Sequence, residues 1–320
     1  MTLLAAMIDQ LLETLQVVQL PLRNTFRGIN VREAALFHGK NGWSEFSPFV
    51  EYEAAESVAW LKAAIEAAEQ PWPEIYRSSI PINATLPAVA EEEVSAVLAR
   101  FAGCTTVKIK VDSFAQGAPL VAKTLELIPN ARIRIDVNGG WSFEQAIQNL
   151  TEFHNRFGDV FEYVEQPSLD TSTLKKIKAQ SPIKIAADES IRKNLTGDLA
   201  QIREFADIAI IKWQPLGGFK AAHRIAQEIG LPVVVSSALD TGIGISHSLA
   251  LAASFSELPF ACGLGTTSLF AADICGAQFE VRDGALEVQS ATPVDIERFA
   301  APADRVQWWK NRIMSAGELL

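Results

Sequence analysis

Residues 105–111 have the sequence Thr-Thr-Val-Lys-Ile-Lys-Val, and residues 133–138 repeat the pattern as Ile-Arg-Ile-Asp-Val-Asn. In both segments β-branched residues alternate with polar ones, which is typical of strands with two unlike faces. The apolar face of a barrel strand packs against helices, so Lys108, Lys110 and Asp136 are expected on the inward face. A Lys-x-Lys pair by itself more often marks a solvated strand edge, so the other strands must decide between the two interpretations.

Six more segments of this kind alternate with amphipathic helical segments. After Ser142, a good N-cap, apolar residues recur every three or four positions toward Arg156, which predicts one of these helices. Eight strands separated by helices predict an α/β fold with a (β/α)8-type barrel, and the short last unit makes it a modified (β/α)7β barrel. The six further strands are expected at residues 80–86, 161–165, 183–187, 208–212, 231–236 and 260–263.

A doubly wound parallel sheet is the alternative architecture. The pairs Gly242-Ile243-Gly244 and Gly263-Leu264-Gly265 lack the third glycine of a dinucleotide-binding fingerprint, and the chain has no P-loop. The barrel is therefore the favoured fold.

The chain is expected to divide into three segments. Residues 1–78 form an N-terminal α+β capping domain, residues 79–276 form the modified TIM barrel, and residues 277–320 return to the capping domain. The capping domain is expected to contain strands at 17–21, 31–37 and 43–49 and a helix at 53–68. The last segment is expected to begin with a hairpin, in which residues 278–281 and 286–288 flank Asp283-Gly284.

Composition limits the classes of function. The chain has 320 residues, a formal net charge of −10 and 48% hydrophobic residues, without a long basic run, which argues against a nucleic-acid partner. No apolar stretch is long enough to span a membrane, and a signal peptide is not expected because Asp9 soon interrupts the apolar start. Three scattered cysteines fit a reducing cytoplasm. We expect a cytoplasmic protein that acts on a small molecule.

Charged residues occupy the expected carboxyl ends of successive strands. Asp136, Glu165 and Asp188 are each about one βα unit apart, so their carboxylates should meet at the barrel mouth, followed by Lys212 on the next strand. Three close carboxylates repel one another and need a cation, and oxygen ligands with room for water or substrate suit Mg²⁺. A structural network of salt bridges that binds no metal is the alternative.

Together these motifs resemble the muconate lactonizing enzyme subgroup of the enolase superfamily. The resemblance implies that Asp136, Glu165 and Asp188 bind Mg²⁺ or Mn²⁺, with Lys110 as base and Lys212 as a cation beside the substrate. In that superfamily a metal-stabilised enediolate follows abstraction of an α-proton. The matching motifs are Lys108-x-Lys110, Asp136-x-Asn138, Glu165-Gln166-Pro167, Asp188-Glu189-Ser190 and Lys212.

Within this subgroup, four further segments are similar to the o-succinylbenzoate synthase family. That similarity implies a syn dehydration in menaquinone biosynthesis that converts 2-succinyl-6-hydroxy-2,4-cyclohexadiene-1-carboxylate to 2-succinylbenzoate. It also implies that Ser236 and the turn at Gly263, Leu264 and Gly265 contact carboxylates. The loop near Arg27 would close over the site, with Arg32 as a second candidate for holding a carboxylate and Asn138 as a further substrate contact. The four segments are residues 26–28, 31–33, 42–49 and 261–266.

Two other functions remain open. N-Succinylamino acid racemases share the fold, the metal site and both lysines, and a racemase would use Lys110 and Lys212 as two bases. A barrel that binds metal and dicarboxylate without catalysis is the second alternative, although it would have no need of an inward lysine beside the metal. The Asp-x-Asp pair that dipeptide epimerases usually carry after the eighth strand is replaced here by Gly263-Leu264-Gly265. The expected partner is a small carboxylate, and a monomer is compatible with the sequence.

Overall fold

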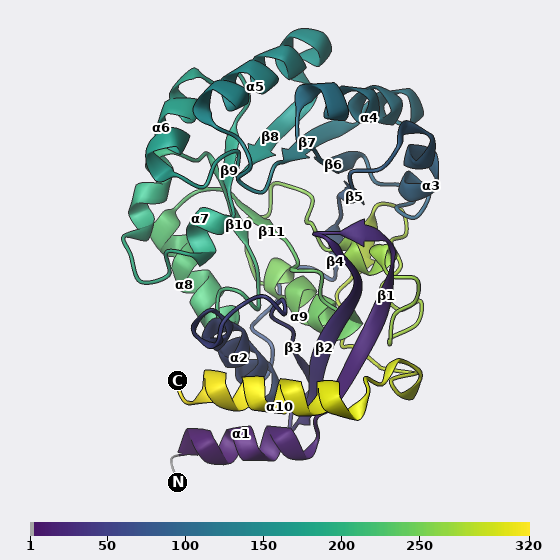
Figure 1. Ribbon diagram of the computed structural model, residues 1–320, viewed down its shortest axis with the longest axis vertical. Helices are drawn as coiled ribbons and strands as arrows, with labels where there is room; N and C mark the ends of the chain where they lie inside the picture. Colours follow the sequence, from purple (N-terminus) through teal and green to yellow (C-terminus); the bar gives the residue numbers. More distant parts are fainter. Residues whose placement is uncertain (1–2) are drawn as a thin grey trace.

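Seven parallel strands follow one another in chain order around a curled sheet that forms the barrel (Figure 1). The computed structural model describes residues 3–320, with side chains from Met7 onward, so residues 1–2 of the expected capping domain lie outside the described part. The strands are β5 (Ala84–Leu86), β6 (Thr106–Lys110), β7 (Arg132–Asp136), β8 (Phe161–Glu165), β9 (Ile185–Ala187), β10 (Ile208–Ile211) and β11 (Val233–Val235).

The barrel closes without a full eighth strand. Isolated parallel bridges join Ser236 to Gly263 and Ile82 to Cys262, so the segment expected as a strand at 260–263 connects β11 to the start of the barrel through single pairs. The short last unit of a modified (β/α)7β barrel is thereby confirmed.

Two expectations about pairing are wrong. The strand expected at 80–86 is two elements, β4 (Ser79–Pro81) and β5, of which only β5 belongs to the barrel. The hairpin expected between 278–281 and 286–288 is reduced to its turn, where one antiparallel bridge joins Arg282 to Ala285 around Asp283-Gly284. Beyond this bridge, β12 (Ala285–Glu287) pairs antiparallel with β4. The Phe279 carbonyl accepts a hydrogen bond from Thr267 Oγ1, and Phe279 and Val281 are buried, so the 278–281 segment packs into the core.

Helices surround the barrel. The one expected after Ser142 is α5 (Phe143–Phe157), and Ser142 and Gln145 form its capping box, as the sequence predicts. Every residue of α9 (Gly242–Ala253) is buried, because this helix lies between the barrel and the capping domain. The remaining barrel helices are α3 (Val94–Leu98), α4 (Phe114–Leu127), α6 (Thr171–Gln180), α7 (Glu189–Arg192) and α8 (Phe219–Ile229).

The N-terminal part is a three-stranded antiparallel sheet covered by helices (Figure 1). The elements are α1 (Leu3–Glu13), β1 (Gln16–Phe26), β2 (Ile29–Gly39), β3 (Gly42–Phe46), α2 (Ala54–Glu69) and α10 (Ala303–Gly317). Helix α10 comes from the other end of the chain and packs against α1, α2 and β1. The division of the chain at residues 78 and 276 stays a prediction.

The β1–β2 hairpin extends farther than the sequence suggests. Its two-residue loop, Arg27-Gly28, has positive φ at both residues (51° and 76°), as a type I′ turn requires. This turn places Arg27 at the barrel mouth, where it lines a pocket together with Lys108 and Lys110. In the described part of the chain, no helix is long and apolar enough to cross a membrane.

Candidate active site

One pocket lies where the barrel mouth meets the capping domain. Each of the six predicted lysines and acids lines it, and so do four of the seven predicted substrate contacts. The predicted residues in its lining are Lys108, Lys110, Asp136, Glu165, Asp188, Lys212, Arg27, Asn138, Ser236 and Gly263.

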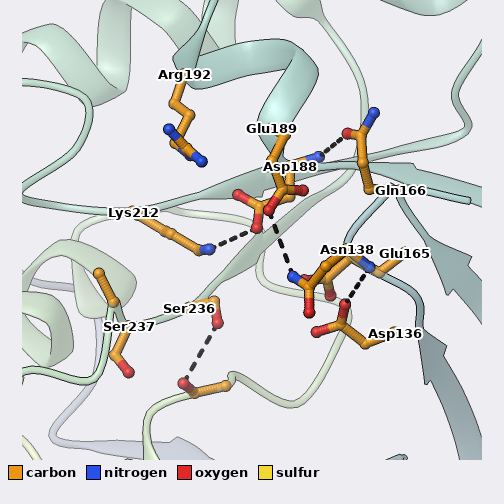
Figure 2. Close-up of polar contacts among 12 residues, drawn as sticks. Asp136, Asn138, Glu165, Gln166, Asp188, Glu189, Arg192, Lys212, Ser236 and Ser237 are labelled. Atoms are coloured by element: carbon orange, nitrogen blue, oxygen red, sulfur yellow. Dashed lines mark hydrogen bonds and ion pairs between the residues drawn. The ribbon is translucent and has the colours of Figure 1, made fainter. Parts of the chain in front are cut away.

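The three acids stand side by side because the strands that carry them are in register. Asp136 pairs with Glu165 across β7 and β8, and Asp188 follows the end of β9. All three carboxylates are buried. Gln166, which has a positive φ of 41°, accepts hydrogen bonds from the backbone N–H groups of Asp188 and Ser190 and so fixes the turn that carries Asp188 (Figure 2).

Three lysines contact these acids. Lys108 Nζ lies 3.0 Å from Glu165 Oε1 and 3.0 Å from Asp136 Oδ2, so it bridges two carboxylates. Lys110 Nζ lies 2.6 Å from Asp136 Oδ2 and donates to Asn138 Oδ1 at 2.6 Å. At the other end of the row, Lys212 Nζ donates to Asp188 Oδ2 at 2.5 Å (Figure 2). Lys110 and Lys212 thus flank the acids from opposite ends.

Burial and neighbouring charges shift the pKa values of this cluster. Burial together with the nearby Asp136 and Asp188 raises the pKa of Glu165 to about 7. Burial opposes ionisation of Asp136 as well, but Lys108 and Lys110 outweigh it and hold that pKa well below its usual range. The pKa of Lys108 is raised by Asp136 and Glu165 against the effect of burial, and Asp188 raises that of Lys212 in the same way.

The donor set suits a hard divalent cation. Asp136, Glu165 and Asp188 offer carboxylate oxygens from three neighbouring strand ends. Burial and the nearby acids raise the pKa of Glu165, so added positive charge would favour its ionised form. Asp136 Oδ2 makes its two lysine contacts without accepting a hydrogen bond of good geometry. Among residues 3–320, lysine ammonium groups lie between the acids, and no three His, Cys, Asp or Glu side chains form a ready-made metal cluster.

The predicted substrate contacts divide into two groups. Ser236 lies against Gly263, and a Cβ at residue 263 would come within 2.5 Å of Ser236 Oγ, so this close approach requires glycine. Leu264 and Gly265 are buried outside the pocket lining, so their expected contact with a carboxylate is not supported. Arg32 is also buried outside the lining and faces backbone carbonyls, which contradicts its expected role at a substrate carboxylate.

The sequence interpretation missed several residues that line the pocket. Glu189 and Arg192 share one face of α7, directly after Asp188, and this helical spacing is a signal that the sequence already contains. Arg192 Nη1 lies 2.6 Å from Glu56 Oε1, and Arg192 and Lys212 line the same pocket, with the guanidinium above the Lys212 side chain in Figure 2. The capping domain adds four aromatic side chains, Phe26, Phe49, Tyr52 and Trp60, which the sequence did not predict as pocket residues.

Comparison with known proteins assigns the family. Residues 17–68 match the model described as enolase N-terminal domain-like, and residues 90–293 match the enolase C-terminal domain-like model. The o-succinylbenzoate synthase of Mycolicibacterium smegmatis is 45% identical over 98% of both chains. The chain belongs to the o-succinylbenzoate synthase family. Another member, from Mycobacterium tuberculosis, is 44% identical over 98% of this chain and 96% of its own length.

Solved structures agree with the fold of this o-succinylbenzoate synthase family member. A muconate lactonizing enzyme from Pseudomonas fluorescens, complexed with muconolactone, has a TM-score of 0.72 at 19% identity, covering 92% of this chain and 97% of its own. The L-Ala-D/L-Glu epimerase from Bacillus subtilis has the same TM-score at 21% identity, covering 87% and 96%. Together with the two enolase family models, these likenesses confirm the predicted enolase-superfamily barrel with a capping domain.

Proposed function

We propose that this chain catalyses the syn dehydration of 2-succinyl-6-hydroxy-2,4-cyclohexadiene-1-carboxylate to 2-succinylbenzoate. The proposal rests on 45% identity to an o-succinylbenzoate synthase over 98% of both chains. The lysines and acids of this chain also line one pocket. A bound divalent cation, held by Asp136, Glu165 and Asp188, would supply positive charge beside the substrate carboxylate.

Lys110 is the proposed proton carrier. Its Nζ is held by Asn138 Oδ1 and Asp136 Oδ2 and lines the pocket, so it can reach a substrate held beside the acids. In neutral form it removes the proton α to the ring carboxylate, which breaks the C–H bond. The resulting ammonium then returns that proton to the leaving hydroxyl as the C–O bond breaks, so water departs and the ring becomes aromatic.

Lys212 and Lys108 are proposed to act as fixed cations. Both pKa values are raised by neighbouring carboxylates, so both side chains stay protonated at neutral pH. Their charges favour the additional negative charge that develops on the substrate carboxylate after proton removal.

N-Succinylamino acid racemisation is the second candidate function. Lys110 and Lys212 flank the acids from opposite ends, which is the arrangement that two bases on opposite faces of a substrate carbon need. Dehydration remains the preferred proposal because the full-length relatives carry that name.

A direct assay separates these possibilities. Pure protein with Mg²⁺ and the cyclohexadiene substrate should show the absorbance of the aromatic product, and Mn²⁺ should be tested in parallel. Dehydration that is absent with either ion would contradict the proposal, whereas racemisation of N-succinylamino acids alone would favour the second candidate. Binding of 2-succinylbenzoate without turnover would indicate a non-catalytic barrel.

The cellular setting is also a proposal. The three cysteines are free and buried, which fits a reducing compartment such as the cytoplasm. We propose Mg²⁺ as the ion and a small dicarboxylate as the partner.

A further inference from the structure

A buried polar network joins the capping domain to one wall of the pocket. The wall is the segment of residues 236–239, of which all four residues line the pocket. On the barrel side, Ser237 Oγ lies 2.6 Å from Thr266 Oγ1. On the other side, the segment meets Arg32 of β2, which is only 1% exposed.

The Arg32 side chain contacts backbone carbonyls of this wall. Arg32 Nε donates to the Leu239 carbonyl at 3.1 Å, and Nη2 donates to the Ala238 carbonyl at 3.4 Å and to that of Ser47. Its guanidinium also stacks 4.4 Å from the centre of the Phe49 ring, which itself lines the pocket. One cation of the capping domain therefore holds two successive carbonyls of the barrel loop.

The turn at Leu239, whose carbonyl Arg32 binds, has an unfavourable backbone conformation. Leu239 has a φ of 63°, in the left-handed region that non-glycine residues rarely adopt. A left-handed leucine persists only where its surroundings fix it, and Arg32 bonds its carbonyl directly. The turn also receives a bond from within the segment, since Leu239 N donates to Ser237 Oγ at 3.2 Å.

Glu45 of β3 secures the residues that follow. Its carboxylate accepts from Thr241 Oγ1 at 2.6 Å and from the Gly244 backbone N–H at 2.9 Å, at the start of α9. A Cβ on Gly244 would lie 2.9 Å from Glu45 Oε2, so the approach depends on glycine there. Gln214 completes the network by donating to Asp240 at 2.8 Å and accepting from the Ser47 backbone N–H at 3.0 Å.

We propose that Arg32 is a positioning residue, by which the capping domain holds the left-handed turn at Leu239 and so sets the shape of the 236–239 wall of the pocket. The part of this inference that concerns substrate rests on the proposed function. Arg32 touches no reacting atom, so its removal should weaken substrate binding more than it slows the bond-breaking steps.

The first experiment needs neither substrate nor metal. Hydrogen exchange is compared in the parent, Arg32→Met and Arg305→Met proteins. Arg305 is the matched control, because it pairs with Glu33 in the capping domain and lies outside the pocket lining. Backbone amides of residues 236–241 should exchange at least tenfold faster in Arg32→Met, while those of β6 to β8 stay unchanged. Unchanged exchange in folded Arg32→Met, or an equal effect of Arg305→Met, would overturn the proposal.

The second experiment is kinetic. Arg32→Met should raise KM for the cyclohexadiene substrate at least tenfold and change kcat less than threefold. Arg32→Lys, which keeps the positive charge and one donor nitrogen, should recover most of the loss. Arg32→Gln replaces Arg32→Met in the exchange measurement if the methionine variant does not fold. Leu239→Gly removes the left-handed strain, so adding Arg32→Met to it should cost less than in the parent. If Arg32→Met has the same effect in the parent and in Leu239→Gly, Arg32 does not act through the turn at Leu239. An inactive parent protein would instead defeat the proposed function and leave the exchange result standing.

Discussion

Lys110 and Lys212 contact acids at opposite ends of one row, and this separation allows unequal tasks. Lys110→Ala should abolish exchange of the α-proton of the cyclohexadiene substrate, because Lys110 is the only base in the proposed dehydration. Lys212→Arg keeps the positive charge, but the guanidinium stays protonated and cannot act as a base. The variant should therefore retain measurable dehydration and show no racemisation. Deuterium exchange followed by mass spectrometry measures removal of the α-proton by Lys110→Ala. Absorbance of the aromatic product measures dehydration by Lys212→Arg. Persistent exchange in Lys110→Ala, or inert but folded Lys212→Arg, would refute this division.

The proposed metal site makes a prediction that does not depend on turnover. Asp188→Asn keeps the shape of the side chain and removes one carboxylate charge, so Mg²⁺ affinity should fall at least about tenfold, equivalent to roughly 1.4 kcal/mol. Calorimetric titration measures the affinity, and thermal unfolding of the metal-free proteins is the control for folding. Equal Mg²⁺ affinity in the parent and the variant would exclude Asp188 from the site.

Arg27 is the predicted carboxylate contact from the capping domain. Its guanidinium stacks 4.2 Å from the centre of the Phe49 ring and donates to Tyr52 Oη at 3.1 Å, beside the pocket. Arg27→Ala should lower kcat/KM by at least about tenfold, roughly 1.4 kcal/mol. Arg23→Ala, in β1 shortly before the turn that carries Arg27 but outside this pocket, is the matched control. If kcat/KM of Arg27→Ala equals that of Arg23→Ala, Arg27 does not contact the substrate.

At the scale of elements, helix α5 is specified by its own sequence. Ser142 Oγ accepts from Gln145 N, and Gln145 Oε1 returns the bond by accepting from Ser142 N. Ser142→Ala should lower the free energy of unfolding by about 1 kcal/mol, because one N–H of the first turn loses its partner. Urea denaturation measures the loss, and kcat/KM should stay at the parent value. An unchanged midpoint would show that solvent replaces the cap.

At the scale of the whole molecule, the buried junction between capping domain and barrel should make stability depend on pH. Burial and the nearby Glu45 raise the pKa of Asp240 to about 7, far above its ordinary 3.8. Between these values the unfolded chain releases a proton that the folded chain keeps, so this group lowers the free energy of unfolding as pH rises from about 4 to 7.

Asp240→Asn tests this junction. The variant cannot ionise at residue 240, so its free energy of unfolding should decrease less between pH 5 and pH 7 than that of the parent, by at least about 1 kcal/mol. Urea denaturation of metal-free protein at each pH provides the comparison. Parallel pH profiles for the two proteins would show that Asp240 is ionised throughout.

Local patterns predicted the barrel and the centre of the site well. Strand alternation depends on neighbouring residues, so Phe161–Glu165 was placed with its bounds correct, and Asp136, Glu165 and Asp188 followed from spacing alone. The 80–86 segment failed because its two halves pair with different partners, β12 and β6, and strand propensity carries no information about partners.

The sequence by itself determined the strand order, the facing of Lys108 and Lys110, and the row of acids, because each depends on periods of two residues or of one βα unit. Only the tertiary structure decided which residues of the capping domain enter the pocket and which lie behind it. Arg32 and Leu239 are 207 residues apart, and their hydrogen bond exists only because β2 packs against the loop after β11. Such a contact depends on how two surfaces meet, and no local pattern in either segment records it.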